Sequence, residues 1–526
     1  MTALAGTGPL VRLIVRRDRL RLSLWIAVLV VVTAGTAAAL AKMFPTEDSR
    51  ALFSTGVESS GALLAVVGPL FQPRTIGGLV AWRLGGIGAV LVALMSLLTV
   101  VRHTRAEESA GRRELVGSAA VGRHAALAAA LLVTASTGVL IAALVTAGLA
   151  AMGLPLAGSL ALGLSFAGAG WVFAAIAAVA AQLVENPRTA SGIAVMTLGV
   201  AYLARAAGDA AQGRLSWLSW LSPIGWAQRV RPFAEEQWWT CGLAAGVAAA
   251  LAVAAHALCA RRDLGAGVLS PRPGRATASR WLAGAPGLAW RLQRGMLLTW
   301  TLGFAVIGGV LGGVAHSVPD LAHSSPRISA VLAVLGGDAE IVDAFFAALF
   351  GVLGVVASGY AVQATLRLRS EEEEARAEPV LAASVSRIGW AAGHLVFAAA
   401  GPAIALAAAG TTAAFVHCGD GDLPRLITAA LVQLPAIWVL GGTAVALFGL
   451  APRQARVSWG LIVGCLLVGQ IGRLLQLPGW VLGLSPFTHL PGPGEAARAA
   501  PLLALVAVAA GLATAGLIGL RRRDLG

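Results

Sequence analysis

Apolar stretches of about twenty residues recur along the whole chain, separated by short polar or Gly- and Pro-rich segments. A helix needs roughly 20 apolar residues to cross about 30 Å of hydrocarbon. The pattern therefore predicts about twelve membrane-spanning helices. We place them near residues 22–41, 84–101, 125–152, 159–183, 189–207, 238–260, 296–314, 344–366, 389–416, 426–450, 457–475 and 501–520.

Composition supports the same fold class. The 526 residues are 57% hydrophobic and only 12% charged, which is more apolar surface than soluble domains of ordinary size can bury. The segments between the predicted spans are too short for a further soluble domain. We expect an all-α integral membrane protein.

The second half of the sequence repeats landmarks of the first at an offset of about 260 to 268 residues. The motif RRDLG occurs at 261–265 and again at 522–526, and LSP occurs at 221–223 and 484–486. Six spans per half is an even number, so both halves would enter the membrane from the same side. This predicts two homologous six-helix halves, a fused pseudo-dimer.

The predicted organisation has three parts. The first transmembrane half is expected at 1–265, a cytoplasmic linker and lead-in helix at 266–294, and the second transmembrane half at 295–526. In the first outer loop, ALLAVVG at 62–68 predicts a short apolar helix on the outer face, and AVLAVLG at 330–336 is its counterpart.

The net charge of +14 comes from arginines in short runs at helix ends, not from one basic face. Membrane topology explains these runs better than nucleic-acid binding. Runs at Arg16-Arg17, Arg261-Arg262 and Arg521 to Arg523 place both termini in the cytoplasm by the positive-inside rule. Lys42 is the only lysine, and the Ala- and Gly-rich composition is typical of a bacterial plasma-membrane protein.

Acidic residues concentrate in two segments, 101–123 and 366–387, which align at an offset of 264 residues. At this offset, three glutamates, one arginine and a final arginine of the first segment each align with a residue of the same type in the second. One interpretation is a helix extension with weak local ion pairs. The other is a pair of coupling helices that dock onto two cytoplasmic motor subunits. The candidate coupling residues are Glu107, Glu108, Gly111, Arg112, Glu114, Arg123, Glu371, Glu372, Arg376, Glu378 and Arg387.

The first of these segments contains R-x-x-x-x-E-E-x-x-G-R-x-E-L, followed by V-G-R, between Arg102 and Arg123. It resembles the permease subunits of ABC-2 type exporters, in particular the twelve-span branch that exports polyketide antibiotics of the tetronasin type. The second copy departs from the pattern, since Ala375 replaces the glycine and Pro379 follows Glu378.

This resemblance implies a permease that exports hydrophobic or amphipathic compounds such as antibiotics and drugs. It implies two copies of a separately encoded ABC ATPase as partners, and these would bind ATP and Mg. The permease itself would bind no cofactor or metal and carry no catalytic residue.

Without the resemblance, the residues alone leave other energy sources and other functions possible. A Walker A loop needs G-x-x-x-x-G-K-[ST], and Lys42 has no such context. An ion-gradient-driven secondary transporter would normally hold acids within the bilayer, whereas the acids here fall in loops or at span ends. A lipid or glycoconjugate permease is a further alternative. His316 and His323 share a predicted outer loop with Asp320, but their seven-residue spacing is a weak signal for the metal site of a membrane enzyme, and a solvated loop is the favoured interpretation.

Few polar or polarisable side chains fall within the spans, and these are candidates for a substrate path. They are Met95, Met196, Tyr202, Tyr360 and Gln470.

Three arginines, Arg83, Arg205 and Arg473, lie near outer span ends, either as snorkelling side chains or as an outer gate. Glycines such as Gly88 and Gly351 are expected at close contacts between helices.

Overall fold

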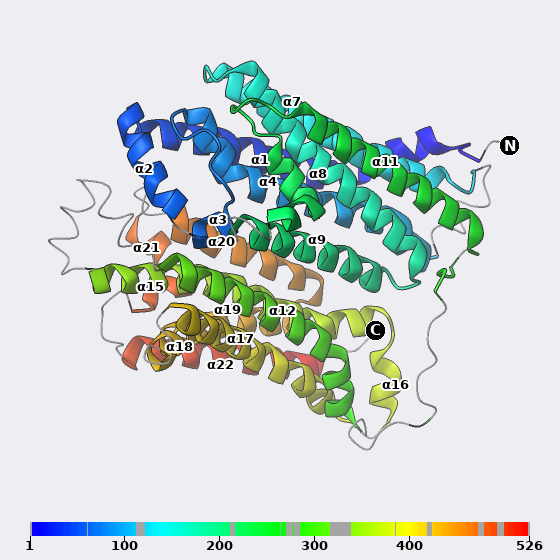
Figure 1. The fold of residues 1–526 in the computed structure, drawn as a ribbon. Coiled ribbons are helices and arrows are strands. Elements are labelled where there is room, and N and C mark those ends of the chain that lie inside the picture. Colours follow the sequence, from blue (N-terminus) through cyan, green and yellow to red (C-terminus); the bar gives the residue numbers. More distant parts are fainter. Residues whose placement is uncertain are drawn as a thin grey trace. The chain divides into compact units, whose positions relative to one another are not determined.

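In the computed structural model, every regular element of the described residues is a helix, so the predicted fold class is confirmed (Figure 1). The chain divides into two compact units, Met1–Gly274 (unit 1) and Arg275–Gly526 (unit 2). The structure describes residues 3–59, 61–111, 121–210, 216–263, 265–269, 277, 284–315, 338–383, 385–417, 423–471, 478–491 and 499–523.

Unit 1 contains long helices joined by short ones. In chain order they are α1 (Thr7–Met43), α2 (Glu47–Ser59), α3 (Gly61–Val66), α4 (Ile76–Val101), the π-helix η1 (Arg102–Ala106), α5 (Glu107–Ser109), α7 (Ala125–Ala151), α8 (Leu156–Leu183), α9 (Pro187–Ala210), the 3-10 helix η2 (Ser216–Leu221), α10 (Pro223–Arg229) and α11 (Trp238–Arg261).

Unit 2 follows a similar order. Its helices are α12 (Ala285–Ala315), α15 (Asp338–Glu373), α16 (Ala377–Ala382), α17 (Arg387–His417), α18 (Leu423–Leu431), α19 (Leu434–Leu450), the 3-10 helix η5 (Pro452–Val457), α20 (Ser458–Ile471), α21 (Gly479–Leu482), the 3-10 helix η6 (Pro486–His489) and α22 (Ala499–Arg522).

Within the described ranges, eleven helical segments are long and apolar enough to cross a membrane. Six belong to unit 1 and five to unit 2, where α18 and α19 together form one of them. The predicted span near 457–475, the eleventh in chain order, is the one that is not among them. It falls on α20, which has 14 residues; residues 472–477 lie outside the described ranges.

Equivalent helices pack against each other in the two units. The pairs α1 with α7, α4 with α8, α8 with α11, and α4 with α9 recur as α12 with α17, α15 with α19, α19 with α22, and α15 with α20. Both units therefore use one packing plan.

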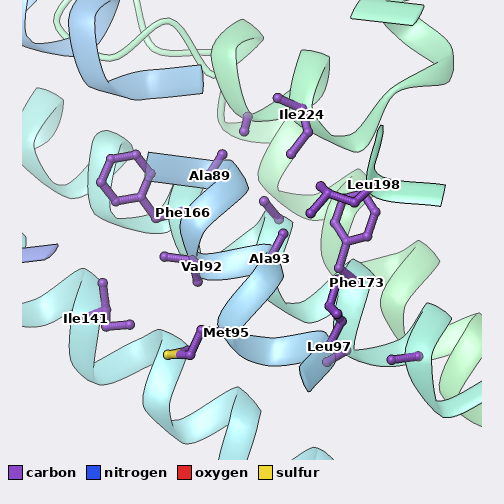
Figure 2. Packing of buried hydrophobic residues seen from close by; sticks show 14 of the residues in the cluster. Ala89, Val92, Ala93, Met95, Leu97, Ile141, Phe166, Phe173, Leu198 and Ile224 are labelled. Carbon is purple, nitrogen blue, oxygen red and sulfur yellow. The ribbon is translucent and has the colours of Figure 1, made fainter. Parts of the chain in front are cut away.

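The core of unit 1 is built around α4 and α8. Both are apolar on every side and largely buried, as expected for central helices. Val92 and Leu97 from α4, with Phe166 and Phe173 from α8, lie among the packed side chains in Figure 2. A Cβ atom at Gly88 would meet the ring of Phe166, so this glycine does allow a close helix contact.

Gly351 differs from that expectation, because a Cβ atom there would meet open space. Very close glycine contacts in unit 2 lie between α19 and α22. A Cβ atom at Gly516 would meet the carbonyl oxygen of Val445, and one at Gly449 would meet the carbonyl oxygen of Gly516. Backbones this close leave no room for a methyl group, which is how small residues hold membrane helices together.

We expect Gly516→Ala to lower the stability of the purified protein by about 1 to 3 kcal/mol, because the added methyl group must push α22 away from α19. Gly511→Ala on the same helix is the control, since its Cβ meets open space. The midpoint of thermal unfolding in detergent measures both. Equal midpoints for the two variants would contradict the close contact.

Candidate functional site

The duplicated charged segment lies at the end of unit 1 where α4 ends and α1 begins. Here α4 continues without a break into the π-helix η1 and then into α5. A π-helical turn holds an extra residue, so it changes the face on which the following side chains lie, and such turns are frequent at functional sites. Arg105 lies within this turn, and Glu108 lies in the short helix α5 directly after it.

Glu108 is the centre of a buried ion-pair cluster. Its two carboxylate oxygens accept hydrogen bonds from Arg262 at 2.7 and 2.8 Å, and Arg105 lies at 3.0 Å. The backbone N–H of Gly265 donates to the same carboxylate at 2.7 Å. The Glu108 side chain is only 2% exposed, so it faces the protein rather than an aqueous partner.

The two arginines connect this carboxylate to other helix ends. Arg262 donates to the side-chain oxygen of Gln182 on α8 at 2.7 Å. Arg105 donates to the carbonyl oxygens of Val184, just after α8, at 2.6 Å and of Ala266, after α11, at 2.8 Å. We call Arg105, Glu108, Gln182 and Arg262 the unit-1 clamp, because they join the ends of α4, α8 and α11.

Arg123 adds a second connection at the same end. Its guanidinium donates to the carbonyl oxygens of Cys259, at 3.0 Å, and of Arg262. The last carbonyl groups of a helix have no partner within that helix, so an arginine from another segment satisfies them.

Unit 2 repeats these contacts at equivalent positions. Arg523 donates to the Glu372 carboxylate at 2.7 Å, and Arg387 donates to the carbonyl oxygen of Arg523 at 2.6 Å. Arg369 donates to the carbonyl oxygen of Pro452, after α19, as Arg105 does after α8. We call Arg369, Glu372 and Arg523 the unit-2 clamp. Both Glu372 and Arg523 keep 17% side-chain exposure, so this pair is less buried than its counterpart.

The turn after each charged helix is also repeated. The N–H of Gly111 donates to the carbonyl of Glu108 at 3.1 Å, and the N–H of Ala375 donates to that of Glu372 at 3.0 Å. Gly111 has φ 69° and Ala375 has φ 54°, both in the left-handed region. Glycine adopts this conformation freely, whereas alanine does so at a cost.

Of the remaining candidate coupling residues, Glu371 is buried, with 8% side-chain exposure, and Glu107 is partly exposed, with 18%. Glu107 pairs with Arg17 of α1 at 2.6 Å, and Glu371 pairs with Arg367 at 2.9 Å. Arg376 and Glu378 are exposed, at the start of α16. Arg112 and Glu114 lie outside the described residues.

Sequence reasoning missed a second buried acid at this end. Asp18 of α1 is 2% exposed and lies 2.8 Å from His103 and 3.2 Å from Arg102. Its helix begins at Thr7, well before the apolar run that marks the predicted span. A helical projection of the basic lead-in would have placed Asp18 on the same face as Ile14 and Leu22, which are also buried.

Arg205 lies at the opposite end of unit 1 and is fully buried. Its guanidinium donates to the carbonyl oxygen of Val66, at the end of α3, at 2.9 Å, and lies 3.6 Å from Asp209. The hydroxyl of Tyr202 donates to the same carbonyl at 2.7 Å. Gln228 donates to the next carbonyl, that of Val67. These side chains fix the short apolar helix predicted around 62–68 to α9 and α10.

The other gate candidates differ from Arg205. Arg83 is exposed on α4, and Arg473 lies outside the described residues.

The candidate substrate-path residues occupy unlike surroundings. Met95 is 1% exposed in the core of unit 1 (Figure 2), whereas Met196 is 68% exposed on α9. Tyr360 is fully buried, with its ring centroid 5.8 Å from that of Trp300. The side chain of Gln470 is outside the described part of the structure. In the residues that are described, no three His, Cys, Asp or Glu side chains gather to hold a metal ion.

These features define a multi-pass α-helical membrane protein whose charged side chains tie helix ends together. Comparison with known proteins narrows the class. The family described as "Multidrug efflux system permease Rv1217c, C-terminal domain" matches residues 282–521. The chain is also 42% identical over 528 residues to the multidrug efflux system permease protein Rv1217c of Mycobacterium tuberculosis (strain ATCC 25618 / H37Rv), covering 99% of this chain and 95% of the relative. The chain therefore belongs to this family of multidrug efflux system permeases.

We expect Glu108→Gln to destabilise the protein by about 3 to 5 kcal/mol, because it leaves Arg105 and Arg262 as buried cations without their carboxylate. Glu107→Gln is the matched control. Its pair with Arg17 is partly exposed, so its loss should cost about 1 kcal/mol or less. Thermal unfolding in detergent measures both variants, and a Glu108→Gln midpoint as high as that of the control would refute the clamp.

Ala375→Gly should raise stability by about 1 kcal/mol, because glycine adopts the left-handed conformation of that turn without the clash of a Cβ atom. Gly111→Ala should lower it for the same reason. Ala382→Gly, the same substitution in the exposed last turn of α16, provides the control and should be slightly destabilising. A decrease in the unfolding midpoint for Ala375→Gly would show that the side chain is needed there.

Proposed function

We propose that this chain is the membrane permease of an exporter that moves hydrophobic or amphipathic compounds, including drugs, out of the cell. The observation that carries the proposal is the similarity over nearly the full length of both chains to a multidrug efflux system permease. The predominantly apolar spans suit amphipathic compounds better than ions or sugars.

The energy source in this proposal is a partner. Two copies of a separately encoded ABC ATPase would bind ATP and Mg and act on the permease, which itself binds no cofactor and catalyses no reaction. The motif between Arg102 and Arg123 supports this, because it resembles that of ABC-2 type permeases of the tetronasin-type branch. The relative is named as the permease of an efflux system, and a system of this kind can contain further components.

The geometry divides the candidate coupling residues into two groups. Glu108, Arg123, Glu372 and Arg387 contact their own unit, so their proposed role is to transmit force between helix ends. The surface for the ATPase is then left to exposed charged groups. In unit 2 these include Glu373, Glu374, Arg376 and Glu378, on which the proposed docking surface is centred.

The proposed topology places both charged ends and both termini in the cytoplasm of a bacterium, following the positive-inside rule. The opposite end of unit 1 would then face outward. Arg205 would contribute to an outer gate through its hold on α3, and Arg83 and Arg473 stay candidates for the same role. Met95, Met196, Tyr202, Tyr360 and Gln470 stay candidates for the substrate path.

One observation favours the alternative of an ion-gradient-driven transporter. Asp18 and His103 form a buried pair of ionisable groups, 2.8 Å apart, inside helices that qualify as membrane spans. Buried ionisable pairs of this kind are typical of proton relays. However, Asp18 also pairs with Arg102, at the charged end of unit 1. In our proposal, the Asp18–His103 pair therefore holds α1 to the end of α4 and does not carry protons.

The double variant Glu374→Lys/Glu378→Lys should release the ATPase subunit, because it reverses the charge of the proposed docking surface while leaving the Glu372–Arg523 pair intact. The tagged full chain is purified from its native host, and co-purifying Walker-A proteins are quantified by mass spectrometry. We expect two ATPase copies per wild-type permease and a reduction of at least about tenfold for the variant, as for loss of a few charge pairs at an interface.

Glu47→Lys/Asp48→Lys in α2 makes the same change of charge on exposed residues at the other end of unit 1 and should retain the ATPase. Absence of any co-purifying ATPase would refute the proposed energy source. Drug efflux that stops with a protonophore and with Asp18→Asn, but not on mutation of the ATPase, would establish the ion-gradient alternative instead.

A further inference from the structure

A cavity of about 390 Å³ opens at the end of unit 1 opposite the clamp. Four segments form its wall: the last turns of α1, the start of α4, the α7–α8 turn, and the loop between α10 and α11. Figure 1 shows α2, which follows α1, and the α7–α8 turn at the end of this unit away from the N-terminus. The volume lies within the range of pockets that bind drug-sized molecules.

The wall is mostly apolar, with Thr75 and Glu236 as its polar side chains. Ala37 and Ala41 line it from α1, Met152 and Pro155 from the α7–α8 turn, and Phe233 from the last loop. Such a surface provides dispersion contacts for the hydrophobic part of a ligand, and it offers few of the hydrogen bonds that a sugar or a peptide requires.

Phe233 is held rigidly in this wall. A Cβ atom at Gly77 of α4 or at Gly158 of α8 would meet its ring, so two glycines make room for the aromatic side chain between these helices. Phe233 also has φ 64°, and Glu235 has φ 53°. Left-handed backbone at residues other than glycine is costly, and here it turns the loop so that Phe233 and Glu236 both reach the cavity.

Glu236 is the one ionisable residue of the wall. It is half-buried, and its carboxylate has no hydrogen bond or ion pair within the described part of unit 1. Two helix C-termini, those of α1 and α7, and two helix N-termini, those of α4 and α8, lie at the wall. The partial negative charges of the C-termini and the partial positive charges of the N-termini therefore largely cancel. Among the residues that line the cavity, the Glu236 carboxylate is therefore the one charge that a ligand would contact.

We propose that this cavity is a binding site for drug-sized amphipathic organic cations. The apolar wall and the Phe233 ring contact the hydrophobic part of the ligand, and Glu236 pairs with its charge. This deepens the proposed function, on which it rests for the direction of transport, but binding itself requires neither the ATPase nor ATP.

The test uses the full-length permease purified in detergent, without any ATPase. Equilibrium dialysis measures binding of tetraphenylphosphonium, an apolar monocation, and of triphenylphosphine oxide, an uncharged compound of similar shape. Glu236→Gln should weaken tetraphenylphosphonium binding about tenfold, as expected for loss of one close charge pair of about 1.4 kcal/mol, and should leave the neutral probe unchanged. Glu235→Gln, an equal change at the exposed neighbour, should alter neither.

Ala41→Trp should abolish binding of both probes, because the indole fills the cavity from an exposed position of α1 that does not disturb the core. Gel filtration confirms that each variant keeps the wild-type elution volume. Tetraphenylphosphonium binding that survives both Glu236→Gln and Ala41→Trp would overturn the site. An equal loss of both probes in Glu236→Gln would overturn cation recognition.

The inference and the proposed function fail separately. Cation binding at this cavity with no ATPase in the co-purification would refute ATP-driven export and leave the site standing. An intact ATPase complex, together with no effect of the Glu236 and Ala41 substitutions on binding, would refute the cavity as the cation site and leave ATP-driven export standing.

Discussion

Moving a charged side chain out of water costs several kcal/mol unless an opposite charge and hydrogen bonds replace its hydration. In unit 1 this constraint determines how the helix ends meet. Glu108 and Arg262 are buried together, and the remaining donors of Arg105 and Arg262 reach backbone or amide oxygens near the ends of α8 and α11. The last carbonyl groups of these helices have no partner within their own helix, and the arginines provide one. The ends stay joined because separating the arginines from Glu108 would leave buried charges unpaired, which is strongly destabilising.

The same requirement explains why the acidic segment is repeated in two diverged halves. Glu108 with Arg262 and Glu372 with Arg523 are equivalent pairs, and both arginines belong to the repeated RRDLG motif. The repeats are not equal, because the second pair is more exposed and its following turn carries Ala375 where the first carries Gly111. Unit 2 thus has the weaker clamp and the costlier turn, so its charged end should open more readily.

Hydropathy predicted the helical class and most spans because the length of an apolar run is fixed by bilayer thickness. The alignment at an offset of 264 also found both clamp glutamates. Sequence alone could not show that Glu108 points inward, since helical spacing places it on a face without stating what covers that face. Asp18 was missed because a hydropathy window excludes the basic turns at the start of α1, although these continue the helix. Arg205 was found, but not its bond to Val66, because contacts between distant segments leave no periodic signal.

The two ends of unit 1 are connected by the same helices. At one end α4 leads into the clamp and α8 stops beside it, while at the other end both helices begin at the cavity that Phe233 and Glu236 line. Between these points α4 and α8 are mostly buried and in contact, with Gly88 seated against Phe166, so neither helix can bend without disturbing the core. A displacement at the clamp is therefore carried along two rigid helices to the wall of the cavity. In the proposed exporter, this would be the mechanical route from the ATPase to the proposed binding site, and it needs no side chains that relay charge across the membrane.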